Sequence, residues 1–397
     1  MISVTRRSAG AARSWAVVDL DAVTHNFREL ERLVGVPVIG VIKADAYGHG
    51  AIQVAEALIR AGASMLAVVC IEEALELRLA GIDVPLLVLS EPAARGKALE
   101  EEIAEGLGAD VHFGVYSSAF VEALISVSER LSRLASVHIK VDTGMHRLGA
   151  NPSEALGLLR AASDSPWIEV RGLWTHMAVA DDPTDDFTHE QLRRFRQFLQ
   201  EARVALGRGQ SWSSVKVHAA NSAAAVAFPE SRFDAVRAGI CLYGERPSPG
   251  FPFPDELRLR PVLRWESTVA LIKEVPRGSR PSYGRTRAVE GTGLAVIPVG
   301  YADGYMRALS NKADILIRGK RHRIAGTVTM DHVIVECAGG SDSRSQVRPG
   351  DVAVLIGRQG EEEITVTELA QKAGTIPYEV FTRIGNRVRR LYEREEQ

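Results

Sequence analysis

A lysine at the end of an apolar run is the first residue of this sequence whose position could support chemistry. Lys43 closes the run VPVIGVIK (36–43) and is followed by the polar stretch ADAYGHG. A lysine placed in a low-dielectric setting has a lowered pKa and becomes a nucleophilic amine, which Schiff-base chemistry requires. Taken alone, a lysine that reaches from a strand end into water explains the same pattern, and this plainer interpretation is favoured at this point.

Four later apolar runs also carry polar residues at their ends. In a (β/α)8 barrel, the C-terminal ends of the strands meet at one face, and the catalytic residues lie there. By itself, His176 is typical of a satisfied core histidine and Arg237 of a barrel ion-pair partner. Together, the strand-end residues predict one shared site: Lys43, Lys140, Asp142, His176, Asn221, Ser222, Arg237 and Gly239.

Two of these strand ends carry groups suited to phosphate. Asn221 and Ser222 open the helical run AAAVAF, and Gly239 and Ile240 follow Arg237. Phosphate is bound by backbone N–H groups at glycine-containing turns and helix N-termini, although Asn-Ser is also an ordinary helix cap. Combined with a Schiff-base lysine, these residues indicate an aldehyde cofactor that bears a phosphate, pyridoxal phosphate.

The elements that must position these residues are eight apolar runs that alternate with helical patterns between residues 15 and 246. Most of the runs are nearly continuous in Val, Ile and Leu, as in parallel strands that are buried on both faces. Eight such steps favour an N-terminal (β/α)8 TIM-like barrel over a doubly wound open sheet, because no G-x-G-x-x-G follows the first strand. The runs are 36–43, 65–70, 85–90, 109–115, 136–142, 170–177, 214–221 and 233–244.

The pattern changes after the proline-rich segment that begins at residue 247. Short strand-like runs such as GLAVIPVG and DVAVLIG are separated by Gly, Pro, Asp and Asn, and long helical patterns are rare. This predicts a separate, mostly β domain over 247–397, with an N-terminal extension over 1–14 before the barrel.

Composition narrows the class of partner. The formal net charge of −2 on 397 residues gives no field for nucleic acid or an anionic membrane, so a small-molecule substrate is expected. The basic N-terminus lacks the apolar region of a secretory signal, and no run approaches the roughly 20 apolar residues of a membrane helix. The three cysteines have neither disulfide nor metal spacing, so no metal is expected and the cytoplasm is the expected location.

The run VIKADAYGHG closely resembles the cofactor-lysine signature of alanine racemases. The likeness continues in order through both domains, in HIKVDTGMHRLG (138–149), LWTHMAVAD (173–181), HAANSAA (218–224), VRAGICLYG (236–244), SYGRT (282–286), VGYADGY (299–305), LSNKADILIRGKRHRIAGTVTMD (309–331) and IPYEV (376–380). The resemblance implies a pyridoxal phosphate barrel with a C-terminal β domain, assembled as a homodimer with shared active sites. It also implies interconversion of L-alanine and D-alanine, which supplies D-alanine for peptidoglycan.

The resemblance assigns a role to each matching residue. Lys43 would hold the cofactor and act as one base, and Tyr283 of the second subunit would be the base on the opposite face, since racemisation removes a proton from one face and returns one on the other. His176 and Arg237 would assist Tyr283, and Arg237 would contact the pyridine nitrogen. The implied phosphate-binding set is Tyr47, Ser222, Gly239, Ile240 and Tyr378.

The remaining implied roles concern the substrate. Arg147 would lie beside the cofactor's phenolic oxygen and the substrate carboxylate, which Met330 of the second subunit would also contact. Lys140 matches a lysine that is often carbamylated and then orients Arg147. Tyr301, Asp181 and Arg307 match positions that line the route to the substrate site. His146, Met306 and His332 depart from the family pattern beside the site, which bears on substrate breadth.

Three alternatives stay open on the sequence. A broad-specificity or serine racemase of the same family would share every motif, because a hydroxyl group is discriminated only modestly. A pyridoxal phosphate-barrel decarboxylase would pair the pyridine nitrogen with a carboxylate, against which Arg237 argues. A barrel protein that binds the cofactor without catalysis would lack the domain that carries Tyr283 and Met330.

Overall fold

The computed structural model describes residues 12–206, 210–337 and 347–394. They form two compact units, one within residues 23–46 and 51–260 and one within residues 12–22, 47–50 and 261–394. Most of strand β1 (Ser14–Asp19) lies in the range 15–246 expected for the barrel, but this strand belongs to the sheet of the second unit, because it pairs with β10 and β18. Most of the expected N-terminal extension, residues 1–11, lies outside the described residues.

The first unit is built around eight parallel strands in the order β8-β7-β6-β5-β4-β3-β2-β9. Strand β9 pairs with β2, and the isolated bridge between His218 and Ala235 joins the β8 and β9 ends of the row. The expected (β/α)8 barrel is therefore confirmed over the open sheet. Each expected run overlaps one strand, and β6 and β7 begin one and two residues before their runs: β2 (Val38–Val41), β3 (Leu66–Val68), β4 (Leu86–Val88), β5 (Val111–Val115), β6 (Ala135–Lys140), β7 (Ile168–Trp174), β8 (Lys216–His218) and β9 (Val236–Ala238).

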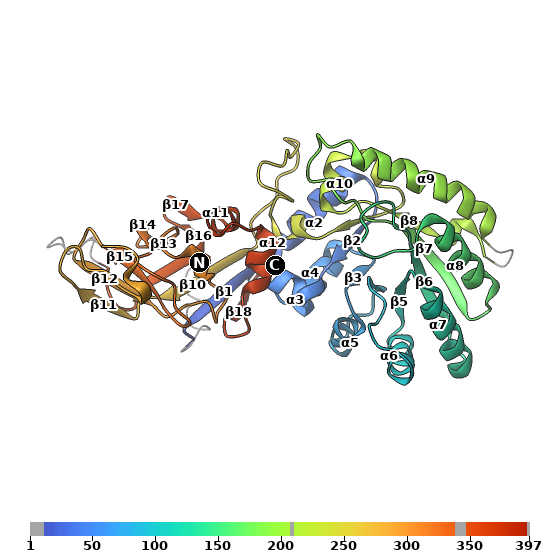
Figure 1. Cartoon of the computed structure of the whole chain (residues 1–397), viewed down its shortest axis with the longest axis horizontal. Coiled ribbons are helices and arrows are strands. Elements are labelled where there is room, and N and C mark those ends of the chain that lie inside the picture. Colours follow the sequence, from blue (N-terminus) through green and yellow to red (C-terminus); the bar gives the residue numbers. More distant parts are fainter. Residues whose placement is uncertain (1–11, 207–209, 338–346, 395–397) are drawn as a thin grey trace. The chain divides into compact units, whose positions relative to one another are not determined.

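Helices separate these strands and lie outside them (Figure 1). Their starts follow local capping rules, since Ser117 caps α7 and Asn151 forms a capping box with Glu154 at the start of α8. The helices are α2 (Leu20–Val34), α3 (Lys43–Gly48), α4 (Ala51–Ala61), α5 (Ile71–Leu79), α6 (Lys97–Gly108), α7 (Ser118–Leu131), α8 (Pro152–Asp164), α9 (Phe187–Ala205) and α10 (Ser222–Ala227).

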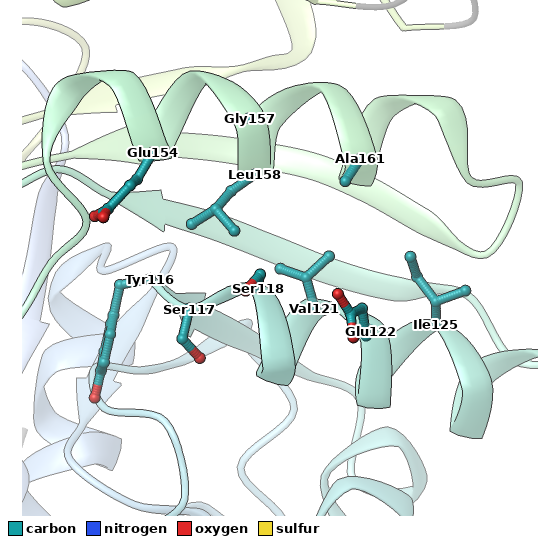
Figure 2. A pocket seen from close by; sticks show the side chains of 10 residues that line it. All are labelled: Tyr116, Ser117, Ser118, Val121, Glu122, Ile125, Glu154, Gly157, Leu158 and Ala161. Carbon is teal, nitrogen blue, oxygen red and sulfur yellow. The ribbon is translucent and has the colours of Figure 1, made fainter.

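A pocket of about 430 Å³ lies between α7 and α8, on the outside of the barrel. Figure 2 shows Val121 and Ile125 of α7 pointing toward Leu158 of α8 across it. None of the residues that line this pocket is among the expected site residues. The pocket therefore belongs to the helix layer and not to the strand ends.

The second unit is mostly β, as expected. Its larger sheet has the order β14-β13-β16-β10-β1-β18, with β17 on β16, and its smaller sheet has the order β11-β12-β15. Strands β10 and β15 alternate between buried and half-buried residues, which is the pattern of strands with one face on a core.

The strands of this unit are β1 (Ser14–Asp19), β10 (Leu263–Thr268), β11 (Leu271–Glu274), β12 (Gly293–Ile297), β13 (Asp314–Ile317), β14 (Lys320–Arg323), β15 (Val333–Cys337), β16 (Val352–Gln359), β17 (Glu362–Ile364) and β18 (Arg389–Glu393). Its helices are α11 (Val366–Ala373) and α12 (Pro377–Arg383). Strand β1 pairs with β10 on one side and, in parallel, with β18 on the other.

Candidate active site

Lys43 stands directly after β2, at the start of a left-handed turn. The next four residues all have positive φ: Ala44 (52°), Asp45 (52°), Ala46 (52°) and Tyr47 (55°). Consecutive residues with side chains avoid this region, at a cost of roughly 1–2 kcal/mol each, so the surrounding structure must impose it. Glu73 does part of this, because its carboxylate accepts hydrogen bonds from the backbone N–H groups of Ala44 (2.6 Å) and Val69 (2.8 Å).

The pKa of the Lys43 amine is lowered, as the expected Schiff-base chemistry requires. Burial lowers its pKa, and the positive charges of Arg147 and Arg237 lower it further, while Glu73 acts in the opposite direction. A larger share of the amine is therefore neutral near pH 7 than for a lysine in water. The surroundings of Lys43 therefore favour a nucleophilic amine over a lysine that only reaches from a strand end into water.

Lys140 lies at the end of β6 in the same positive field. Burial, together with Arg237 and Arg147, lowers its pKa to about 7, against the opposing effect of Asp142. Its Nζ stands 4.5 Å from the centre of the Trp174 ring. The barrel thus gathers four basic side chains near its strand ends, Lys43, Lys140, Arg147 and Arg237, and an anionic ligand would stabilise their charged forms.

Arg237 is buried on β9, with a relative exposure of 3%. Its Nη1 donates to Nδ1 (2.8 Å) and O (3.1 Å) of His218, and its Nη2 donates to O of Thr175 (2.7 Å) and O of Ala219 (2.9 Å). Nη2 also lies 3.2 Å from Nδ1 of His176. These contacts use the terminal N–H groups and leave the Nε–H without an acceptor in the part of the chain that the structure describes. Burial lowers the pKa of Arg237 to about 9, so the side chain stays cationic near neutral pH.

The expected phosphate-binding residues of the barrel converge on the start of α10. Asn221 caps this helix by accepting from the N–H of Ala224 (3.0 Å), and the hydroxyl of Ser222 accepts from the N–H of Gly239 (2.9 Å). Ile240 follows Gly239 and is buried. The start of α10 and the turn at Gly239 and Ile240 are thereby brought side by side. Backbone N–H groups at helix starts and turns of this kind bind phosphate.

Two further members of the expected phosphate set belong to the second unit. The rings of Tyr47 and Tyr378 lie 6.0 Å apart. Their segment is tied down by Arg390, whose Nε donates to O of Gly48 (3.0 Å), and by the edge contact of His49 with Phe381 at 4.6 Å. The tyrosine pair is therefore held in a defined geometry.

Tyr283 lies on the surface of the second unit, where 74% of it is exposed. Its loop is held from both sides, because Ser282 Oγ donates to O of Thr327 (2.6 Å) and Thr327 Oγ1 donates to O of Tyr283 (2.8 Å). Tyr301, Arg307 and Met330 of the same unit are also exposed. A large aromatic side chain on a well-anchored, exposed loop is a feature of surfaces that meet a partner.

Arg147 and Asp181 are exposed residues of the barrel unit. Asp142 shapes the loop that carries Arg147, because its Oδ1 accepts from the N–H groups of Gly144 (2.9 Å) and His146 (3.2 Å). His146 has a φ of 53°, in the left-handed region that residues with a side chain rarely adopt.

Sequence reasoning missed Glu73, His138 and His218 as contributors to the site. Glu73 lies in an ordinary helical pattern, IEEALELRL, so no signal distinguished it. His138 could have been found, because it precedes Lys140 by two positions and so shares its face of the strand.

Comparison with known proteins decides the family. The family model described as "Alanine racemase, N-terminal domain" matches residues 18–247, and "Alanine racemase, C-terminal domain" matches residues 262–392. The chain belongs to the alanine racemase family. The resemblance read from the motifs is confirmed, and with it the enzyme class, an isomerase of the alanine racemase family.

Individual relatives match over nearly their whole length. The chain is 43% identical to an alanine racemase of Symbiobacterium thermophilum, covering 96% of this chain and 98% of that protein. It is 42% identical to one of Carboxydothermus hydrogenoformans, covering 95% and 99%.

Among solved structures, the alanine racemase of D-cycloserine-producing Streptomyces lavendulae matches with a TM-score of 0.88 at 35% identity, over 97% of this chain and 98% of that one. The alanine racemase of Bacillus anthracis with bound L-Ala-P matches with a TM-score of 0.84 at 35% identity, over 96% and 95%. Both alanine racemase domains are therefore present in this chain, unlike in a protein that ends after the barrel.

Within the described residues, no cluster of His, Cys, Asp and Glu side chains has the arrangement of a metal site. Over the same residues, none of the helices is long and apolar enough to cross a membrane.

Proposed function

We propose that this chain interconverts L-alanine and D-alanine with pyridoxal phosphate held on Lys43, and that Lys43 and Tyr283 are bases on opposite faces of the bound substrate. The observation that carries the proposal is the binding mode of Arg237. Its terminal N–H groups are committed to protein acceptors, and its Nε–H is left to donate to a ring nitrogen. A cation in this place keeps such a nitrogen unprotonated.

The residues present fit the cofactor. The hydroxyl of Ser222, the N–H groups at Gly239 and Ile240, and the start of α10 after Asn221 are suited to its phosphate, with Tyr47 and Tyr378 as further donors. Pyridoxal phosphate, when bound, supplies an electron-withdrawing ring that makes the α-hydrogen of an attached amino acid removable. Arg147 is the cation for the substrate carboxylate, with the backbone N–H of Met330 as a second donor.

The two bases are prepared in different ways. The lowered pKa of Lys43 lets its amine accept the α-proton near neutral pH. A tyrosine that acts as a base near neutral pH needs a donor that stabilises its phenolate, and this applies to Tyr283. His176 can be that donor, because Arg237 only donates and thus requires a bare Nδ1 on His176, which leaves a proton on its Nε2.

Tyr283 comes from a second copy of the chain in this proposal, so each site of the homodimer needs both subunits. The exposure of Tyr283, Tyr301 and Met330 on the single chain supports such a contact. Asp181, Tyr301 and Arg307 line the route to the site, and the activity supplies D-alanine for peptidoglycan in the cytoplasm.

Arg237 disfavours the decarboxylase alternative, because that class pairs the pyridine nitrogen with a carboxylate. Among the described residues, no carboxylate contributes to the pKa of this guanidinium, which burial lowers. A serine or broad-specificity racemase would use the same residues, and a panel of L- and D-amino acids separates that outcome from alanine specificity.

The proton-exchange rates of a Tyr283→Phe variant test the two-base assignment. Because the two enantiomers are equally stable, any variant must lose kcat/KM equally in both directions, so steady-state racemisation does not separate the bases. Exchange of the α-hydrogen with deuterated solvent does separate them, when each enantiomer is followed by itself. We expect Tyr283→Phe to retain exchange from one enantiomer and to lose at least about 100-fold from the other.

Lys43→Ala is the matched variant, and it should lose exchange from both enantiomers, because it removes the cofactor attachment as well as a base. Equal exchange losses for the two enantiomers in Tyr283→Phe would contradict the assignment of Tyr283.

A further inference from the structure

Three histidines inside the barrel continue the contacts of Arg237 away from the strand ends. Nδ1 of His218 accepts from Arg237 (2.8 Å), Nε2 of His218 lies 2.9 Å from Nδ1 of His138, and Nε2 of His138 lies 3.0 Å from Nδ1 of His112. The three rings come from β8, β6 and β5. His218 and His138 are fully buried, whereas His112 is half-buried near the start of its strand.

The direction of the hydrogen bonds in this histidine series follows from Arg237 alone. A guanidinium has donors and no acceptor, so Nδ1 of His218 must be bare and its proton must sit on Nε2. That Nε2–H then donates to a bare Nδ1 of His138, whose own proton sits on Nε2. The same step repeats at His112. All three rings therefore have the Nε2–H form, and the Nε2–H groups of His218 and His138 each have an acceptor.

The strand between β6 and β8 makes room for this arrangement. A Cβ on Gly172 of β7 would stand 2.1 Å from Nδ1 of His138, so only glycine fits there. Two residues later, the ring of Trp174 stacks on His218 with centres 5.7 Å apart, and its Nε1 donates to O of His138 (3.3 Å). Packing thus fixes the plane of the His138 and His218 rings, as a hydrogen-bond series requires.

The surroundings keep the series neutral. Burial lowers the pKa values of His138 and His218 well below the usual range, and Arg237 lowers both further. At His112, burial and the charges of Arg171 and Arg78 lower the pKa to about 4, against the effect of Asp110. Near pH 7, each ring therefore carries one proton and can both donate and accept.

We propose that His138 is a positioning residue for the reaction, which holds the acceptor nitrogen of His218 toward Arg237 and is itself oriented by His112. The backbone oxygens of Thr175 and Ala219 hold Nη2 of Arg237, whereas Nη1 is held by both the ring and the backbone oxygen of His218. Without His138, the buried Nε2–H of His218 lacks its acceptor, and this ring loses the contact that holds its Nδ1 in line. The effect then reaches the Nε–H of Arg237, which is the group proposed to meet the ring nitrogen.

Histidine NMR of the chain, with and without cofactor, tests the series independently of activity. The protein has 10 histidines, and selective ¹⁵N labelling with the variants His112→Asn, His138→Asn and His218→Asn assigns the three rings. We expect a proton on Nε2 and a bare Nδ1 for all three near pH 7. A proton on Nδ1 of His218 or His138, or a cationic His138, would overturn the proposal.

Kinetics of two His138 variants test the positioning role, which rests on the proposed function. His138→Asn keeps an acceptor near the place of Nδ1, whereas His138→Leu keeps the volume and removes the acceptor. We expect His138→Leu to lower kcat roughly tenfold with little change in KM, similar to removing an outer partner of a metal-bound histidine, and His138→Asn to recover most of the loss. His322→Leu is the control, because His322 is a half-buried histidine of β14 in the other unit.

A role in packing predicts the opposite order, with Leu better than Asn, and that order would refute the proposal, as would wild-type kcat in both. If His138→Leu fails to fold, the wild-type tautomers and the kcat of His138→Asn still decide. Absence of racemisation in the wild type would refute the proposed function and leave the NMR result to stand by itself.

Discussion

Lys140 illustrates how the barrel unit changes the chemistry of a single side chain. It is 4% exposed, and burial with neighbouring Arg237 and Arg147 acts against its ammonium form. The same positive field favours a negative group at this position. A neutral amine in such a place can bond to carbon dioxide through Nζ, release one proton and become a carbamate.

We therefore predict that Lys140 is carbamylated in a pH-dependent way. Its pKa of about 7 means that the reactive neutral amine predominates at pH 8 and the unreactive ammonium at pH 6, so carbamylation should rise between these values. ¹³C NMR of protein incubated with ¹³C-bicarbonate measures the carbamate directly. Lys140→Gln is the control that must lack the signal, and a wild-type spectrum without it at pH 8 would rule the modification out.

The turn after β2 shows how an element can oppose the preference of its residues. Four consecutive residues with side chains adopt left-handed φ values, and Ala44 and Asp45 among them are exposed. Acceptors on Glu73 and Asp45 hold the ends of the turn, through the N–H groups of Ala44 and Ala51. The geometry at Lys43 is thus maintained against local strain.

Glycine at position 44 should stabilise the protein. Ala44→Gly removes left-handed strain of roughly 1–2 kcal/mol and adds about 0.5–1 kcal/mol of backbone entropy cost, so the free energy of unfolding should rise by up to about 1 kcal/mol. Ala161→Gly, at an exposed position of the right-handed α8, should lower it by about 1 kcal/mol. Urea midpoints of the two variants compare them, and a shift of the same sign in both would show that the turn is unstrained.

The sequence predicted elements whose signal is local and missed those whose cause is distant. All eight barrel strands were predictable because parallel strands buried on both faces are continuous in Val, Ile and Leu. The left-handed turn was not, since ADAY contains no glycine and its geometry depends on Glu73 of another helix. The residues of β1 are apolar enough for a strand, but its partners β10 and β18 lie far along the chain.

The whole molecule joins a barrel unit that carries Lys43 to a second unit that carries Tyr283. The motifs point to both residues in the sequence, because the family's signatures surround them, and their catalytic roles stay predictions. Which chain supplies each base to a given site depends on assembly, and the proposed homodimer answers that question with two chains per site.

Mixing two inactive variants tests this assembly. In a mixed dimer of Lys43→Ala and Tyr283→Phe chains, one site has both bases intact, so random pairing should restore about a quarter of wild-type activity. Chains that carry both substitutions, mixed with Lys43→Ala chains, form no intact site and should stay inactive. Failure of the first mixture to exceed this control, with dimer exchange verified by mass spectrometry, would place both bases on one chain.

The parallel pairing of β1 with β18 has a consequence for how the protein is made. Residues 14–19 are synthesised before every other strand of their sheet, yet they complete this sheet only after residues 389–393 have been synthesised. The barrel residues 23–46 and 51–260 can begin to fold during translation, whereas β1 must wait with one edge unpaired. The nascent chain therefore carries a strand with an unpaired edge until residues 389–393 emerge. This edge is the part of the chain where chaperone protection matters most.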